Sequence, residues 1–396
     1  MGVSKINILA QSHLYHNLQA YPKINDPSPL GSYSADDAIF LLKDIGPLIK
    51  EQGNEERERA IQSGKHYSEM LPIEYKPNRE YIDLFHQALK ETSHRLALAT
   101  AIVAETILKK RGRNVVLVSL ARAGTPIGVL IKRYIQQFYR INAPHYSISI
   151  IRDKGIDKNA LLYILQRHPN CNLQFIDGWT GKGTITKELL QSAVDFEREF
   201  ELAQNTICRD MAVLADPGYC ANIFGTRDDF LIPSACLNST ISGLVSRTVY
   251  RDDLIGPADF HGVKFYQELA GEDLSNYFVD VISGNFNAVS KRAQSLLLKE
   301  PEIGVDKKPA WLGRKETTSI MNEFGIKNIN LVKPGVGETT RVLLRRVPWK
   351  ILVKDITNPD LKHVLILAQA RGVQVIEYPN MNYSCYGLIK PMGENQ

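Results

Sequence analysis

Four short apolar runs alternate with helix-forming segments in the middle of the 396-residue chain, and this alternation limits the possible folds more than any other feature. The runs span residues 115–119, 146–151, 173–177 and 211–215. Strands joined by helices form right-handed crossovers and lie parallel in one sheet. We therefore expect an α/β fold in which the loops that follow these strands meet at one edge, where open α/β sheets bind their ligands.

The loop after the third run has the composition of a phosphate-binding turn. Gly181 and Gly183 adopt positive φ cheaply, so that backbone N–H groups can converge on an anion. A helix-forming segment follows at 185–200, and the start of a helix favours phosphate. The turn is not a Walker loop, because Lys182 is followed by glycine; an ordinary strand-to-helix turn is the alternative. Its candidate binding residues are Asp177, Thr180, Gly181, Lys182, Gly183 and Thr184.

A second loop of this kind follows the first run. It contains Ser119, Arg122 and Gly124, and an arginine beside a glycine turn suits a diphosphate because Arg binds phosphate oxygens through two hydrogen bonds. The alternative is a tight turn with a surface arginine. After the second run, Arg152 and Lys154 form a charged loop at the same edge. That loop either closes over a bound diphosphate or has no special role.

The flanking segments predict the domain organisation. Residues 1–110 are expected to be mainly helical, with one helix that begins near Ser34 and buries Ile39 to Ile45, and a long helix at 81–110. We predict a helical N-terminal region at 1–110 that packs on the core, a central domain at 111–300, a linker at 301–310 and a C-terminal domain at 311–396.

Two polar segments are candidates for lining a site. Residues 62–72 carry Lys, His, Tyr and Glu together, which favours a loop at a site over a plain linker. Residues 233–247 are rich in small hydroxyl side chains. There Ser239 or Thr240 is expected to cap a helix that presents Arg247 to a pocket, although capped helix starts of this kind are common.

The C-terminal segment has its own strand and helix pattern, with strands expected at 329–332, 349–353 and 373–378 and a helix at 359–371. From residue 302 onwards the chain has 14 basic and 9 acidic side chains, so the entire net charge of +5 lies there. A local excess of positive charge suits a polyanion. The candidate contacts to a sugar-phosphate chain are Gly335, Gly337, Glu338, Thr339 and Arg341. The alternative is a small domain used for docking or dimerisation.

The cysteines predict a reducing location. The five cysteines form no Cys-x-x-Cys pair and are odd in number, as expected for reduced thiols in a cytoplasm. No apolar run reaches the length of a membrane span, so we expect no membrane association.

Several motifs resemble known families. The turn at 177–184 resembles the phosphoribosyl-diphosphate loop of type I phosphoribosyltransferases, although Gly178 replaces the second acid, and Arg-Ala-Gly at 122–124 resembles the pyrophosphate loop of the uracil-type enzymes. Gly-Val-Gly-Glu-Thr-Thr-Arg at 335–341 resembles the Pelota-like RNA-binding family. With Gly-Ser-Tyr-Ser-Ala-Asp-Asp at 31–37 and Ile-Pro-Ser-Ala at 232–235, the whole chain resembles a bacterial family of tellurite-resistance gene clusters.

That family carries two labels, a phosphoribosyltransferase-like enzyme and the cysteine protease StiP. The first implies a type I phosphoribosyltransferase-like core that transfers ribose 5-phosphate from phosphoribosyl diphosphate to an unknown acceptor, with expected Mg²⁺. Residues 181–184 would hold the 5-phosphate, and Asp177 the ribose hydroxyls, directly or through Mg²⁺. Arg122 with Ser119 and Gly124 would hold the diphosphate, helped by Arg152 or Lys154.

The second label implies an activated thiol. Cys220 and Cys236 are the candidate nucleophiles, with His66 or His261 as the base. Neither cysteine lies in a protease signature, whereas the strand–loop–helix units predict one another, so we predict the transferase. A non-catalytic protein that binds a nucleotide or RNA is a further alternative.

Overall fold

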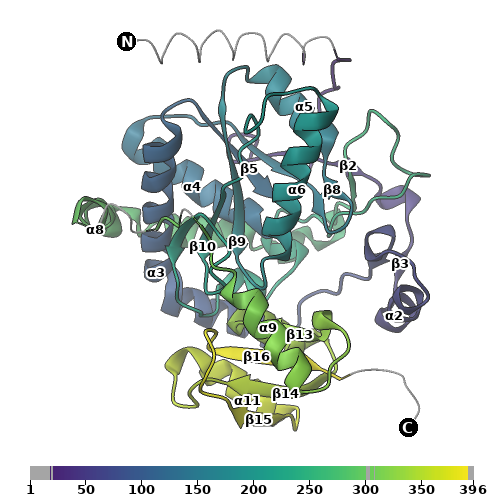
Figure 1. The fold of residues 1–396 in the computed structure, drawn as a ribbon, viewed down its shortest axis with the longest axis vertical. Coiled ribbons are helices and arrows are strands. Elements are labelled where there is room, and N and C mark those ends of the chain that lie inside the picture. The colour runs from purple at the N-terminus through teal and green to yellow at the C-terminus, as the bar shows by residue number, and fades with distance from the viewer. Residues whose placement is uncertain (1–17, 19–20, 300–303, 307, 391–396) are drawn as a thin grey trace.

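The computed structural model describes residues 18, 21–299, 304–306 and 308–390, and its core is a six-stranded parallel sheet (Figure 1). The strands lie in the order β1-β6-β5-β9-β10-β11. Their bounds are Ile39–Leu41 for β1, Val115–Leu120 for β5, His145–Ile148 for β6, Asn172–Trp179 for β9, Met211–Ala215 for β10 and Ile223–Thr226 for β11. The predicted α/β class and parallel sheet are confirmed.

Helices cover both faces of this sheet, because its central strands are apolar on both sides. Along β5, Val115 and Leu117 enter one apolar cluster, and Val116 and Val118 enter the other. The first face is covered by α3 (Arg79–Arg111) and α4 (Gly124–Tyr139), with α7 (Ser275–Ser283) and α8 (Phe286–Lys299) outside them. The second face is covered by α5 (Lys158–Arg167) and α6 (Thr184–Glu199).

The strand order reverses at β5. This strand pairs with β6 on one side and with β9 on the other, so the chain leaves β5 in one direction and later continues in the opposite one. The loops after β5 and β9 therefore flank the switch point of the sheet, which is where ligands bind in doubly wound folds.

The prediction of a helix near Ser34 that buries residues 39–45 is wrong. Residues 39–41 form β1, which pairs with β6 as an edge strand of the sheet. Phe40 and Leu41 enter apolar clusters on opposite faces, as successive strand residues do. Periodicity alone does not separate a short buried strand from a helix, so this apolar run fits both.

Three two-stranded pairings lie outside the six-stranded sheet. The expected strand 146–151 is broken at Ser149, and β7 (Ile150–Ile151) instead pairs antiparallel with β8 (Gly155–Ile156). Earlier in the chain, α2 (Asn54–Gln62) is flanked by β3 (Glu51–Gln52) and β4 (Leu71–Pro72), which pair with each other. In Figure 1 this unit stands to the side of the sheet. The remaining small pair joins β2 (Lys43–Asp44) to β12 (Gly262–Val263).

The C-terminal domain is a small mixed α/β unit whose sheet has the order β13-β16-β14-β15. Its elements are α9 (Leu312–Glu323), β13 (Val332–Pro334), α10 (Val336–Arg345), β14 (Pro348–Val353), α11 (Lys362–Ala370), β15 (Gln374–Glu377) and β16 (Cys385–Ile389). The expected first strand begins only at Val332, after a short 3-10 turn. The strand β16 was not predicted, although it pairs with both β13 and β14.

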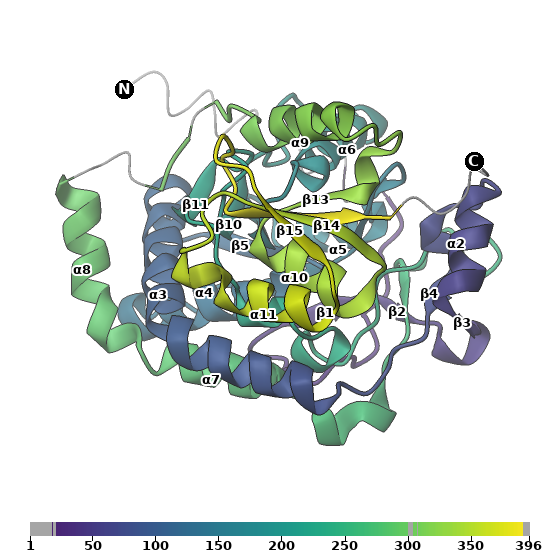
Figure 2. The same ribbon diagram turned by 90° about the horizontal axis from the view of Figure 1, so that it is seen from below.

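This domain is docked on the core through a continuous apolar cluster. Val336, Leu343 and Leu344 of α10 belong to the same cluster as the α3 and α4 face of the sheet. Tyr81 donates a hydrogen bond of 2.5 Å to the Leu344 carbonyl. Figure 2 shows the molecule from below, with this domain in front of the core. The domain boundaries inferred above stay a prediction. Among the described residues, no helix has both the length and the apolarity needed to cross a bilayer.

Candidate functional site

The turn after β9 is where the sequence predicts a phosphate cradle, and side chains of the C-terminal domain fill it. The Tyr383 hydroxyl donates a 2.8 Å hydrogen bond to the Gly181 carbonyl, and the Lys182 ammonium donates one of 2.8 Å to the Ile329 carbonyl. Gly183 has φ of 77°, as expected, but a Cβ atom placed on it would lie 2.6 Å from the Trp311 ring. In this arrangement the turn holds its own chain in place of a phosphate.

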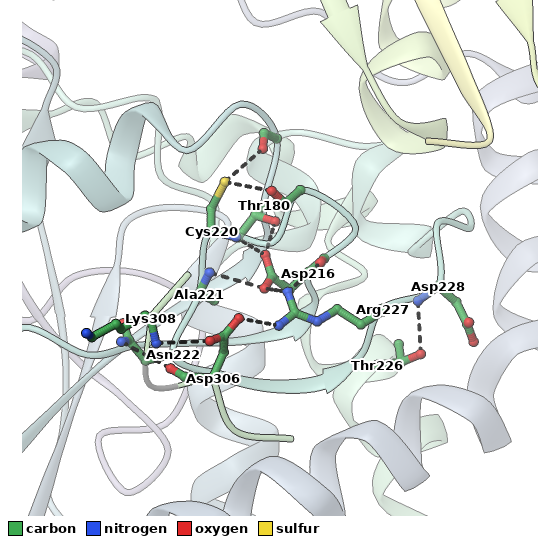
Figure 3. A network of polar contacts seen from close by, with 12 residues as sticks. Thr180, Asp216, Cys220, Ala221, Asn222, Thr226, Arg227, Asp228, Asp306 and Lys308 are labelled. Carbon is green, nitrogen blue, oxygen red and sulfur yellow. Dashed lines mark hydrogen bonds and ion pairs between the residues drawn. The ribbon is translucent and has the colours of Figure 1, made fainter. Parts of the chain in front are cut away.

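Beneath the turn, a buried network of polar contacts fixes the neighbouring loop (Figure 3). The Asp216 carboxylate accepts hydrogen bonds from the Thr180 hydroxyl at 2.5 Å, from the Cys220 amide at 2.8 Å and from the Ala221 amide at 3.1 Å. Arg227 pairs with Asp216 and, at 3.0 Å, with Asp306. Burial raises the pKa of Asp216, while Arg227 and these donors act in the opposite direction. Each of these charges has an opposite partner, so we regard the network as structural.

Cys220 lies between this network and the start of α6. Its thiol donates to the Gly218 carbonyl at 3.1 Å, and a Cβ atom on Gly183 would be 2.8 Å from its sulfur. The side chain is fully buried, and burial raises the pKa of the thiol to about 12, with the Asp216 charge adding to the effect. The thiol is therefore protonated in this arrangement, although it lies at a helix start that would stabilise a thiolate.

The other predicted protease residues lie apart from Cys220. Cys236 is buried in the apolar cluster beneath α10, and burial raises the pKa of its thiol to about 12. The ring Nδ1 of His66 contacts the Ser68 hydroxyl at 2.7 Å, and that of His261 contacts the Ser149 hydroxyl at 2.9 Å. In the described part of the chain, no hydrogen bond joins a cysteine sulfur to a histidine ring.

The loops after β5 and β9 do meet at one edge, as predicted. A Cβ atom on Gly124 would lie 2.4 Å from the Ile176 carbonyl, so only glycine allows this approach. Asp177 accepts a 2.8 Å hydrogen bond from the Gly178 amide, and burial raises its pKa to about 7. Arg122 lies 3.7 Å from the carboxylate of Glu74, which lies in the segment after β4.

The remaining transferase candidates are only partly brought together. Ser119 is buried and its hydroxyl contacts the His145 ring at 2.7 Å, below the edge where a ligand would lie. Arg152 and Lys182 both donate to the Asn330 side-chain oxygen, at 3.3 and 3.2 Å. Lys154 points elsewhere, with its ammonium 5.8 Å from the centre of the Tyr250 ring.

The predicted RNA-binding residues face the core. Val336, at the start of α10, donates its amide to the Asp229 carboxylate at 2.9 Å, and a Cβ atom on the preceding Gly335 would lie 3.1 Å from that carboxylate. A Cβ atom on Gly337 would lie 3.4 Å from the Ala235 side chain. Of the other predicted residues, Thr339 is buried, and Arg341 donates to the Ala235 carbonyl at 3.2 Å and to Glu338 at 3.1 Å.

Several residues of this junction were not singled out from the sequence. Asp229 accepts hydrogen bonds from two C-terminal amides, those of Val336 and Ser384, and burial raises its pKa to about 7. Trp179 lies under Arg341, whose guanidinium is 5.0 Å from the centre of its ring. No local pattern marks either residue, because their partners are more than 100 positions away in the chain.

Two family models match the chain. The model described as "Tellurite-like stress resistance cysteine protease StiP" matches residues 31–283, and the "PELOTA RNA binding domain" model matches residues 311–391. A relative named "Cysteine protease StiP", from Acinetobacter baylyi (strain ATCC 33305 / BD413 / ADP1), is 34% identical over 375 residues. The aligned region covers 92% of this chain and 95% of the relative.

These matches overturn the predicted activity. The prediction of a phosphoribosyltransferase is wrong, because both the family and the relative are described as cysteine proteases. In the arrangement described, Tyr383 is bonded to the turn assigned to the 5-phosphate and Trp311 lies against Gly183 in it. The expected Mg²⁺ stays an untested prediction; within the described residues, no three candidate His, Cys, Asp or Glu ligands gather. From the extent of both matches, the chain belongs to the StiP family of tellurite-like stress resistance proteins and carries a Pelota RNA-binding domain at its C-terminal end.

Proposed function

We propose that this chain is a cysteine protease of a stress response and that Cys220 is its nucleophile. The observation that carries the activity is the 34% identity, over nearly the whole chain, to a relative named as a cysteine protease. A thiolate at Cys220 would attack the carbonyl carbon of a peptide bond, the amine would leave with a proton, and water would then release the acyl group. Reduced thiols are required, so a cytoplasmic location belongs to the proposal.

The position of Cys220 supports it over the other cysteines. Its sulfur lies at the carboxyl edge of the sheet and against the start of α6, where the helix dipole stabilises a thiolate. Cys171 and Cys208 precede β9 and β10, so they lie at the opposite edge. Cys236 and Cys385 belong to the apolar cluster.

Activity is expected to require movement of the C-terminal domain. A buried thiol whose pKa is raised to about 12 carries little thiolate at neutral pH. Trp311 lies against the Gly183 turn above it, and Tyr383 is bonded to the same turn. Displacing these two side chains would admit water to the thiol, lower its pKa and open a path for a peptide.

Mutagenesis of the full chain tests the nucleophile. We expect Cys220→Ala to abolish cleavage of a denatured protein such as casein. The matched control Cys236→Ala, another buried cysteine next to the junction, is expected to retain it. Full activity in Cys220→Ala, with loss in Cys236→Ala, would move the nucleophile to Cys236. Alkylation by iodoacetamide before the assay should act as Cys220→Ala does.

A second proposed function is RNA binding by the C-terminal domain. The match to the Pelota model over residues 311–391 supports it, together with the excess of positive charge in this part of the chain. The finer proposal is that Gly335, Gly337, Glu338, Thr339 and Arg341 contact the RNA. Fluorescence anisotropy with a labelled RNA stem-loop tests it, and affinity should fall as salt rises. Absent or salt-independent binding would favour a docking domain.

At the level of fold alone, we also propose that the core has the architecture of type I phosphoribosyltransferases. The parallel sheet with its switch point between β5 and β9 supports this likeness. An experimental structure whose core strands superpose poorly on that fold would refute it.

A further inference from the structure

The junction between the two domains gathers cationic side chains from both. We call these residues the junction cluster: Arg122, Arg152, Lys182 and Arg247 of the core, and Lys333, Arg341 and Arg346 of the C-terminal domain. Arg152 and Lys182 share one acceptor, the side-chain oxygen of Asn330. The acids paired with members of the cluster are Glu74 with Arg122, Asp153 with Arg152, and Glu338 with Arg341.

Two members of the cluster form no ion pair with the described residues, although the Glu338 charge lies near one of them, Lys333. Within the described residues, neither Arg247 nor Lys333 donates a side-chain hydrogen bond or forms an ion pair, and both side chains are half-buried. The Arg247 guanidinium lies 4.7 Å from the centre of the Tyr67 ring, and the Arg152 guanidinium lies 4.9 Å from the same ring. One aromatic side chain is thus contacted by two cations.

The cations of the cluster repel one another. Burial, together with Arg57, Arg122 and Arg346, lowers the pKa of Arg247 to about 10. Burial also lowers the pKa of Lys333. The Glu338 charge opposes this shift, while Arg346, Arg152 and Arg341 add to it. Like charges held together in a half-buried place destabilise the free protein, and a bound anion relieves that repulsion.

We propose that the junction cluster binds the phosphate backbone of a single-stranded RNA segment, with both domains contributing cations. Cations interleaved with aromatic rings, here Tyr67 and Trp179, are the chemistry of single-stranded nucleic acid sites. This site goes beyond RNA binding by the C-terminal domain, because the core supplies four of its seven cations. It rests on the proposed RNA-binding function.

The location also explains how RNA reaches α10 in the docked arrangement. The first turn of α10 faces Asp229 and Ala235 of the core, so a strand that touched it from outside would have to displace them. A strand bound at the junction cluster would instead contact Arg341 and Lys333 of the C-terminal domain and Arg122 and Arg247 of the core. Core cations then contact the same strand.

Anisotropy with the full chain tests this proposal, using a fluorescein-labelled single-stranded RNA of mixed sequence titrated at several salt concentrations. The test variant is the double substitution Arg247→Gln with Lys333→Gln. It breaks no ion pair of the described residues, and Glu338 near Lys333 keeps its ion pair with Arg341. We expect about tenfold weaker binding and a salt slope smaller by roughly 1.4, since each single-strand phosphate contact contributes ~0.7. The matched control is Lys291→Gln, an exposed cation on α8 away from the junction. It should bind within twofold of the wild type, and thermal melts confirm folding.

The outcomes separate this inference from the function on which it rests. If the wild type binds RNA and the double variant binds equally well, the junction proposal is overturned while RNA binding by the C-terminal domain stands. If the wild type binds no RNA, both the junction proposal and the proposed RNA binding by the C-terminal domain are overturned. If millimolar AMP displaces the strand completely, the cluster is a site for a small phosphate ester, and the RNA proposal is overturned.

Discussion

The network around Asp216 and the junction cluster lie close together at the carboxyl edge of one sheet, yet they treat charge in opposite ways. In the first, the Asp216 carboxylate is matched by Arg227 and by three hydrogen-bond donors, and Arg227 is matched by a second acid. In the second, Arg247 and Lys333 form no ion pair within the described residues, and Glu338, which lies near Lys333, is paired with Arg341. Internal pairing is the signature of a structural network, whereas unmatched like charge points to a ligand that supplies the missing anion.

The largest expected effect is a loss of stability when the network around Asp216 is broken. Replacing Asp216→Asn leaves Arg227 half-paired in a buried place, and breaking such a pair costs about 3 kcal/mol. We expect the free energy of unfolding, measured by urea titration, to fall by about that amount. Asp306→Asn, which removes the more exposed partner, should cost about 1 kcal/mol. Equal and small losses in both variants would mean that the network is not structural.

The second largest expected effect concerns the Trp311 ring, which lies against the Gly183 turn above Cys220. Trp311→Ala opens the space over Gly183, so we expect iodoacetamide to alkylate Cys220 roughly tenfold faster, because a more hydrated thiol has a lower pKa. Peptide mapping by mass spectrometry gives the rate at that residue. Trp349→Ala, at the Phe324 side of the C-terminal domain, is the control and should leave the rate unchanged. An unchanged rate in Trp311→Ala would show that the ring does not protect the thiol.

The raised pKa of Asp229 predicts that the free energy of unfolding depends on pH, with an effect of intermediate size. Burial raises its pKa to about 7 from an ordinary value of 3.8, so the folded protein holds the proton more tightly than the unfolded chain. Its contribution to stability is therefore greatest below pH 4 and is lost as pH rises through about 7. We expect the difference in unfolding free energy between wild type and Asp229→Asn to change by roughly 1–3 kcal/mol across this window.

The exposed neighbour Asp228 provides the control for that measurement. Asp228→Asn should show a pH profile parallel to the wild type. A wild-type profile that also runs parallel to that of Asp229→Asn would mean that Asp229 does not hold a proton at the junction.

The smallest expected effect concerns Arg247 of the junction cluster. Because Arg247 has no ion pair to lose, Arg247→Gln should change the unfolding free energy by less than about 0.5 kcal/mol, or raise it slightly through reduced repulsion. Arg227→Gln, the matched arginine in the paired network, should lower it by about 3 kcal/mol. Similar losses in the two variants would remove the distinction between the two regions.

The sequence alone determined the parts of this protein that depend on local periodicity and on turn chemistry. The alternation of apolar runs with helical segments predicted β5, β9 and β10 and the parallel sheet, because buried strands and their crossovers have a short-range signature. It failed at residues 39–41, where three apolar residues fit a strand and a helix equally well. Of the two glycines expected to adopt positive φ, Gly183 does so and Gly181 does not.

Only the tertiary structure decided what fills the edge of the sheet. Tyr383 and Trp311 lie about 130 to 200 positions from the glycine turn that they cover. Asp229 lies 107 positions from Val336, whose amide donates a hydrogen bond to it. Such contacts arise from domain docking and leave no local pattern. The same docking brings Lys333 next to Arg152 and Arg346 next to Arg247, so the positive junction exists only when both domains are assembled.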